Sequence, residues 1–179
     1  TSANQPWTAQ TVLKGTSGWD RFDVSGRKDN HNDSNPYNLT ELIATEGSDI
    51  YIGSEQTEKL TYQTLKQDKL SGLYVSDEPE NLPLVTDNMP PLVANEYRDD
   101  SLLIYKANEN VDTYDIDIAK DIEVIQLSNK DDRAVLTTKS TSIINFMGGT
   151  DEALIKAENV YPMINRLVNV EKIIWEPLN

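Results

Sequence analysis

The residues with the most obvious capacity for chemistry are oxygen ligands gathered between positions 29 and 35. Asp29, His31, Asp33 and Asn35 occupy alternate positions, as in loops that present every second side chain to a calcium ion, although His31 is a poor ligand for that ion. An EF-hand loop that began at Asp29 would need glycine where Ser34 stands and glutamate where Thr40 stands. Two interpretations therefore stay open, namely a calcium site at Asp29, Asp33 and Asn35, or a solvated turn.

A second pair of acids, Asp115 and Asp117, lies in a segment that alternates as a strand. The other face of this segment carries Ile116 and Ile118, so both carboxylates project from the same side of the chain. Paired acids of this kind serve glycoside hydrolysis, bind a divalent cation, or simply form the polar face of a half-buried sheet. All three interpretations remain open for Asp115 and Asp117.

The sequence offers few residues for thiolate, histidine or phosphate-binding chemistry. The chain has no cysteine, which excludes thiolate nucleophiles and zinc–thiolate sites, and its single histidine, His31, lies in a loop-like segment. Gly148 and Gly149 could cradle a phosphate, but Asp151 and Glu152 follow them and would repel an anion. We therefore expect no required cofactor, and calcium is the one ion that the sequence suggests.

The negative net charge of the chain limits the molecules that it can bind. Thirty acids against sixteen bases give a formal charge of -14, which repels the phosphate backbone of nucleic acids. No apolar run approaches the ~20 residues of a membrane-spanning helix, so we expect no membrane insertion.

The first half of the chain predicts short strands separated by polar loops. Residues 39–45 could be a strand, but Leu39, Leu42 and Ile43 share a helical face, which favours one short helical turn. Four prolines between positions 77 and 95 predict a long irregular crossing, because proline cannot donate to a sheet. Strands are expected at residues 11–14, 21–25 and 48–53, with two more between 59 and 75.

The second half predicts an antiparallel meander followed by a helix. Residues 128–132 have the composition of a hairpin turn, and residues 151–168 carry an apolar stripe typical of a helix packed on a sheet. The meander strands are expected at 101–106, 114–119, 122–127, 134–138 and 142–147, with a closing strand at 170–175. No internal repeat is evident.

These elements predict an α+β fold, a mainly antiparallel, sandwich-like β-sheet with one C-terminal helix packed on it. The chain, residues 1–179, is expected to form a single β-rich domain with a sub-domain seam in the Pro-rich crossing at 77–95.

The sequence favours a non-enzymatic extracellular surface or assembly subunit, of filament or virion type, that acts through protein–protein contacts. The partner would be a second copy or another surface protein, and an extended arm at residues 1–14 would add a strand to a sheet edge. The alternatives are a small-ligand or glycan-binding module and a carboxylate-dependent hydrolase. Thr1 in place of an initiator methionine suggests a processed N-terminus, hence a secreted or cell-surface protein, with a virion protein as the alternative.

Overall fold

The computed structural model describes residues 11–27, 39–65, 70–78, 101–108 and 114–178. These residues form two β-sheets and one short helix, α2 (Tyr161–Ile164). Sheet A is entirely parallel and has the order β1 (Thr11–Lys14), β3 (Leu39–Ile43), β5 (Thr57–Thr61), β9 (Val124–Gln126), β11 (Ile143–Asn145) and β13 (Leu167–Val168).

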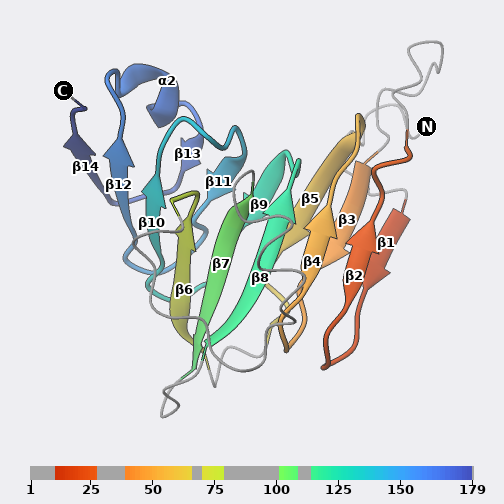
Figure 1. Cartoon of the computed structure of the whole chain (residues 1–179). Helices are drawn as coiled ribbons and strands as arrows, with labels where there is room; N and C mark the ends of the chain where they lie inside the picture. Colours follow the sequence, from red (N-terminus) through yellow and green to blue (C-terminus); the bar gives the residue numbers. More distant parts are fainter. Residues whose placement is uncertain (1–10, 28–38, 66–69, 79–100, 109–113, 179) are drawn as a thin grey trace, which may run out of the picture.

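Sheet B has eight strands and is parallel except in its centre. Its order is β14 (Lys172–Glu176), β12 (Glu152–Lys156), β10 (Arg133–Leu136), β6 (Leu70–Ser76), β7 (Leu102–Asn108), β8 (Tyr114–Lys120), β4 (Ile50–Ile52) and β2 (Arg21–Asp23). Figure 1 shows β14 and β2 at the two opposite ends of this sheet.

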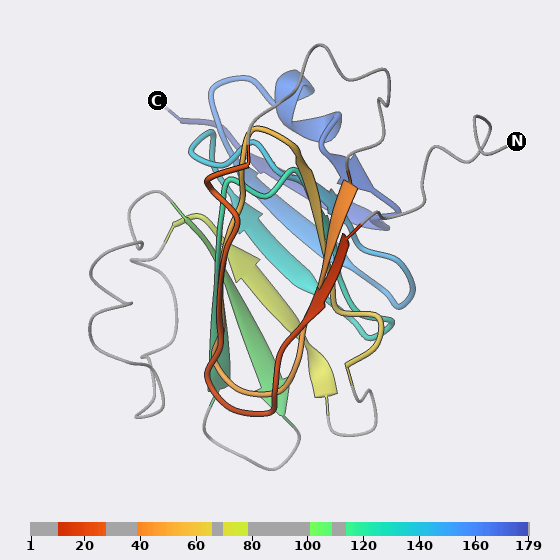
Figure 2. The same cartoon turned by 90° about the vertical axis from the view of Figure 1, so that its right-hand side faces the viewer.

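The chain winds as a coil, because consecutive strands alternate between the two sheets. Apart from β7, each strand therefore pairs in parallel with a strand of an adjacent coil. In sheet B, Arg133 pairs with Glu152 and Glu152 with Lys172, a step of 19 and then 20 residues. Figure 2 shows the two sheets as opposite walls of this coil. The protein is thus a two-sheet solenoid in which each coil rests on its neighbour.

One departure interrupts the coil. After β6 the chain remains in sheet B and runs through β7 and β8, which pair antiparallel, before it returns to sheet A at β9. This insertion explains why sheet B has eight strands and sheet A six.

The main core lies between the two sheets. The inner coils contribute one or two inward side chains per strand. Leu60 and Ile125 from sheet A and Leu136 and Ile155 from sheet B are examples, and all four are fully buried. A second buried cluster forms on the outer face of sheet B, from Ile50, Ile52, Leu103, Tyr105, Ile116 and Ile118. The centre of sheet B is therefore apolar on both faces, as in sheets that are covered on both sides.

Glycines allow the turns of successive coils to approach closely. Gly149 has a positive φ of 104°, and a Cβ placed on it would lie 2.2 Å from the carbonyl oxygen of Lys130. Gly47, with a φ of 93°, meets the carbonyl oxygen of Gly18 in the same way at 2.4 Å. The Gly148–Gly149 pair therefore lies in a turn between β11 and β12, not in a turn before a helix.

The predicted fold class was wrong. Most strand pairs are parallel, and the antiparallel pairs are confined to β6–β7 and β7–β8. The prediction failed because period-two alternation identifies a strand without revealing the direction of its partner. Residues 128–132 illustrate the error, because they connect sheet A to sheet B and do not form a hairpin.

Both predicted helices were also wrong. Residues 39–43 form β3, and the stretch from 151 to 168 contains β12, the four-residue helix α2 and β13 in place of one helix. Alanine and leucine in Glu152–Lys156 fit a helical stripe as well as a strand, and pairing with β10 and β14 decides the outcome. The strands expected at 48–53 and 170–175 are confirmed as β4 and β14.

Candidate functional site

An acid precedes the sheet-B strand in five coils. Each acid lies at the turn where the chain leaves sheet A, and the residue two positions after it is apolar and points inward. The five are Asp20 before β2, Asp49 before β4, Asp132 before β10, Asp151 before β12 and Glu171 before β14. This pattern is the internal repeat that the sequence analysis missed.

These acids form a hydrogen-bonded ladder along the C-terminal coils. The backbone N–H of Asp132 donates to Oδ1 of Asp151 at 2.8 Å, and the N–H of Asp151 donates to Oε2 of Glu171 at 2.7 Å. At the other end, the N–H of Leu73 donates to Oδ1 of Asp132 at 2.8 Å. Each acid therefore satisfies a backbone donor of the preceding coil, which fixes the spacing between coils.

Burial changes the protonation of this part of the ladder. It raises the pKa of Asp132 to about 7, although two hydrogen bonds from Ser128 oppose the shift. Burial, together with the adjacent carboxyl group of Glu171, raises the pKa of Asp151 to about 6. Oδ2 of Asp151 is buried and accepts no hydrogen bond within the described part of the chain. Burial therefore makes the ionised forms of Asp132 and Asp151 less favourable than they are in water.

The ladder of the N-terminal coils continues into the antiparallel insertion. The N–H of Asp20 donates to Oδ1 of Asp49, and the N–H of Asp49 donates to Oδ1 of Asp117, both at 2.9 Å. Asp117 lies in the middle of β8, so a strand residue takes the place that a turn acid holds elsewhere.

Lys106 from β7 lies beside this acid. Its ammonium nitrogen is 2.7 Å from Oδ1 of Asp117 and 3.8 Å from Oδ2 of Asp49, and it donates to the carbonyl oxygens of Thr45, at 2.9 Å, and Gly47. The side chain of Lys106 is 3% exposed and both carboxylates are fully buried. An internal ion pair thus anchors the insertion to the solenoid.

Two tyrosines complete the cluster. The hydroxyl of Tyr62 donates to Oδ2 of Asp117 at 2.7 Å, and that of Tyr51 donates to Oδ2 of Asp49 at 3.4 Å. Burial raises the pKa of Asp49 to about 7, with the charge of Asp117 adding to it and Lys106 opposing. Burial also raises the pKa of Asp117, against the ammonium of Lys106 and the hydroxyl of Tyr62. Because none of these carboxylates reaches solvent, the cluster holds the fold together and does not line a cleft.

The predicted site residues have different outcomes. Asp115 and Asp117 do project from one face of β8, but this face points between the sheets, and Asp117 pairs with Lys106 in place of forming a solvated surface. Asp29, Asp33 and Asn35 lie outside the described residues. Within the described ranges, no group of three or more histidine, cysteine or acidic side chains could hold a metal ion.

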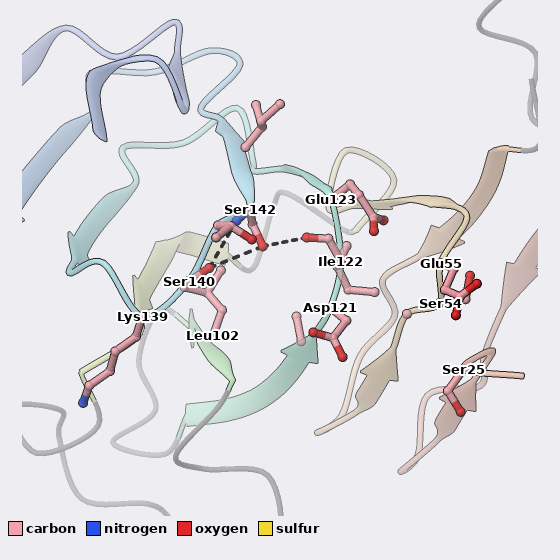
Figure 3. Close-up of a pocket in the computed structure, with 14 residues that line it drawn as sticks. Ser25, Ser54, Glu55, Leu102, Asp121, Ile122, Glu123, Lys139, Ser140 and Ser142 are labelled. Atoms are coloured by element: carbon pink, nitrogen blue, oxygen red, sulfur yellow. Dashed lines mark hydrogen bonds between the residues drawn. The ribbon is translucent and has the colours of Figure 1, made fainter. Parts of the chain in front are cut away.

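A hollow of about 600 Å³ opens on the other edge of the solenoid, where the chain returns from sheet B to sheet A. Figure 3 shows Glu55, Asp121 and Glu123 on one side of it and Lys139, Ser140 and Ser142 on the other. Oε2 of Glu123 accepts the N–H of Glu58 at 2.8 Å, and burial raises the pKa of Glu123 to about 7. The hollow combines acids and hydroxyl groups and could hold a small polar ligand.

The C-terminal end of the solenoid exposes residues that belong to the core. Ile173 and Trp175 of β14 pair with Ala153 and Ile155, which face inward and are fully buried. Yet Ile173 is 40% and Trp175 47% exposed, because among the described strands β14 pairs only with β12. Sequence reasoning placed the strand correctly but could not show that it lies at an open edge.

No helix in the described part of the chain is long and apolar enough to cross a membrane. No family model, curated protein or solved structure matches this chain.

Proposed function

We propose that this protein is a structural module of an assembly and that it acts through protein–protein contacts at the open C-terminal edge, defined as β14 with its exposed side chains. The observation that supports this proposal is the exposure of Ile173 and Trp175 in a row that is otherwise buried. Exposed apolar side chains along a sheet edge favour a contact surface.

The strand itself has few of the features that usually protect a sheet edge. β14 has five consecutive residues in regular pairing with β12, contains no proline, and carries one lysine at its first position. Leu178, two residues beyond β14, is also exposed, at 52%. This edge favours strand addition.

The proposal relocates the contact expected from the sequence. The arm at residues 1–14 was expected to add a strand to a neighbour, but residues 11–14 form β1 and pair with β3 of their own chain. Residues 1–10 and most of the Pro-rich crossing lie outside the described residues. The secreted, cell-surface or virion setting stays a prediction.

Sedimentation over a range of protein concentrations tests the proposal. We expect the wild-type chain to associate and Trp175→Asp to remain monomeric, because the substitution places a charge in the exposed apolar row. Trp19→Asp is the matched control, since Trp19 is 48% exposed but lies before β2 at the far end of sheet B. A melting curve checks that Trp175→Asp is folded, because the indole N–H also donates to the carbonyl oxygen of Ala157. Equal association of wild type and Trp175→Asp would contradict the proposal.

A second candidate function is the binding of a small polyhydroxylated ligand, such as a sugar, in the hollow of Figure 3. The acids and serine hydroxyls that line it support this candidate, since they can accept and donate hydrogen bonds to such a ligand. A ligand that binds only the folded state raises the melting temperature. We expect a sugar-induced rise in wild type that is reduced in Glu123→Gln; the absence of a rise with every sugar tested would remove this candidate.

A further inference from the structure

We propose that the partner of the open C-terminal edge is a second copy of this chain, whose β14 pairs antiparallel with β14 around a two-fold axis at Ile174; this inference rests on the proposed function. It would join two copies of sheet B into one continuous sheet. Closed two-fold dimers are the commonest form of homo-oligomer.

The backbone of β14 presents the correct groups for this pairing. The N–H of Lys172 donates to the carbonyl oxygen of Asp151, so Lys172 and Ile174 direct their backbone groups toward β12. Ile173 and Trp175 alternate with them and direct their N–H and C=O groups to the free edge. In an antiparallel pair centred on Ile174, Ile173 of one copy lies opposite Trp175 of the other, and the two residues exchange both backbone hydrogen bonds.

The side chains of β14 are complementary to themselves in this register. On the outward face, Lys172 of each copy lies opposite Glu176 of the other, and the two Ile174 side chains meet at the axis. On the inward face, Ile173 meets Trp175, so that the exposed apolar row of each copy covers that of the other. Opposite charges and an aliphatic–aromatic pair are favourable cross-strand neighbours.

Head-to-tail stacking, in which β14 of one copy pairs with β2 of the next, brings less favourable charges together. Parallel pairing in sheet B aligns the residues that follow the ladder acids, as in Arg133, Glu152 and Lys172. A second copy that continued the solenoid through β2 would place Arg21 beside Lys172, because Arg21 follows the ladder acid Asp20. Like charges in neighbouring strands repel. The charges of β14 therefore favour the two-fold arrangement over an open filament.

Cysteine cross-linking tests the geometry directly, because the chain has no cysteine of its own. Residues opposite each other at a site without backbone hydrogen bonds have Cα atoms about 4.5 Å apart, which a disulfide can bridge. We expect Ile174→Cys to give a covalent dimer under mild oxidation. Val12→Cys, which is 55% exposed on β1, is the control and should remain monomeric. A wild type that associates while Ile174→Cys fails to cross-link would overturn the two-fold register without affecting the proposed function.

Charge exchange gives an independent test of the same register. Lys172→Glu and Glu176→Lys should each weaken self-association by about tenfold, because each places like charges opposite one another twice per dimer. An equimolar mixture of the two variants should restore association, since opposite charges then face each other again. Lys139→Glu, an exposed change away from the edge, is the control and should have no effect. Stronger association of Lys172→Glu alone would indicate head-to-tail contact with Arg21, whereas a monomeric wild type would contradict both this inference and self-association as the function.

Discussion

The two halves of the acid ladder hold buried carboxylates in different ways. In the C-terminal half, Asp132 and Asp151 accept backbone donors, and no ammonium or guanidinium group of the described residues contacts them. In the N-terminal half, the ammonium of Lys106 lies 2.7 Å from Asp117 and stabilises its charge. The same backbone donors are thus accepted by acids that no described cation contacts in one half, and by acids that share the ammonium of Lys106 in the other.

The difference follows from the antiparallel insertion. A regular coil supplies its acid from the turn, where Ser128 and the neighbouring backbone donate to it. In the insertion, the acid that takes this place is Asp117, which projects from the middle of β8 into the core. A carboxylate there needs a counter-charge, because burial of an unpaired charge is expensive. The ammonium of Lys106 lies near both Asp117 and Asp49. Asp49 is the more distant of the two, and its pKa is raised to about 7.

The largest expected effect comes from removal of this counter-charge. Lys106→Met should lower the free energy of unfolding by about 3–5 kcal/mol at pH 8, because it leaves Asp117 and Asp49 buried without a cation. The loss should shrink at pH 5.5, where the raised pKa of Asp49 allows it to become neutral. Denaturant unfolding at both pH values measures the change.

Lys59→Met is the matched control for this prediction. Its ion pair with Glu41, at 3.2 Å, lies at the surface with both side chains partly exposed, and it should contribute less than about 1 kcal/mol. If both lysine variants lost the same small amount, the internal ion pair would not hold the insertion in place.

A smaller effect is expected in the other half of the ladder. Asp132→Ala removes the acceptor of the N–H groups of Leu73 and Ser128, and both donors are buried. Each unsatisfied buried donor costs about 1–3 kcal/mol, and removal of the desolvated carboxyl group offsets part of this cost, so we expect a net loss of about 2–4 kcal/mol in urea unfolding. Asp23→Ala removes the equivalent hydrogen bond to the exposed Ser25, and should change stability by no more than about 0.5 kcal/mol. Similar losses in the two variants would show that the ladder is not a structural element.

The strands of this fold were predictable because each one alternates or carries bulky apolar residues. Ile50–Ile52 and Lys172–Glu176 were found in this way. Their partners were not predictable, because strands 19 or 20 residues apart pair in parallel while the connections between them resemble hairpin turns. Helical periodicity misled in Glu152–Lys156, where pairing on both sides outweighs local propensity.

The candidate site was only partly visible in the sequence. Asp115 and Asp117 were correctly placed on one face, but no pattern in the residues indicated that this face points into the core. Lys106 was missed, since a lysine in a strand is ordinarily exposed. The ladder itself had a detectable signal, an acid two residues before an inward apolar position, as in Asp132 and Asp151. Insertions of unequal length between coils concealed this repeat.

The smallest expected effect concerns Asp151 in the C-terminal half, where the pH dependence of stability distinguishes proton uptake from hydrogen bonding. Asp151 has a folded-state pKa of about 6, above the ~3.9 of an unfolded chain, so the folded protein binds an extra proton between about pH 4 and pH 6. Its contribution is therefore complete below about pH 4 and is lost as the pH rises through about 6. Stability should fall across this interval.

Asp151→Asn should remove that part of the pH dependence. The amide oxygen can still accept the N–H of Asp132, while the amide nitrogen can replace Oδ2, which has no described hydrogen-bond donor. After allowance for solvent screening, we expect the variant to gain about 1 kcal/mol over wild type at pH 8 and to match it near pH 4. Unfolding curves at a series of pH values measure the difference. Parallel pH profiles would mean that Asp151 stays ionised in the fold although no cation of the described residues contacts it.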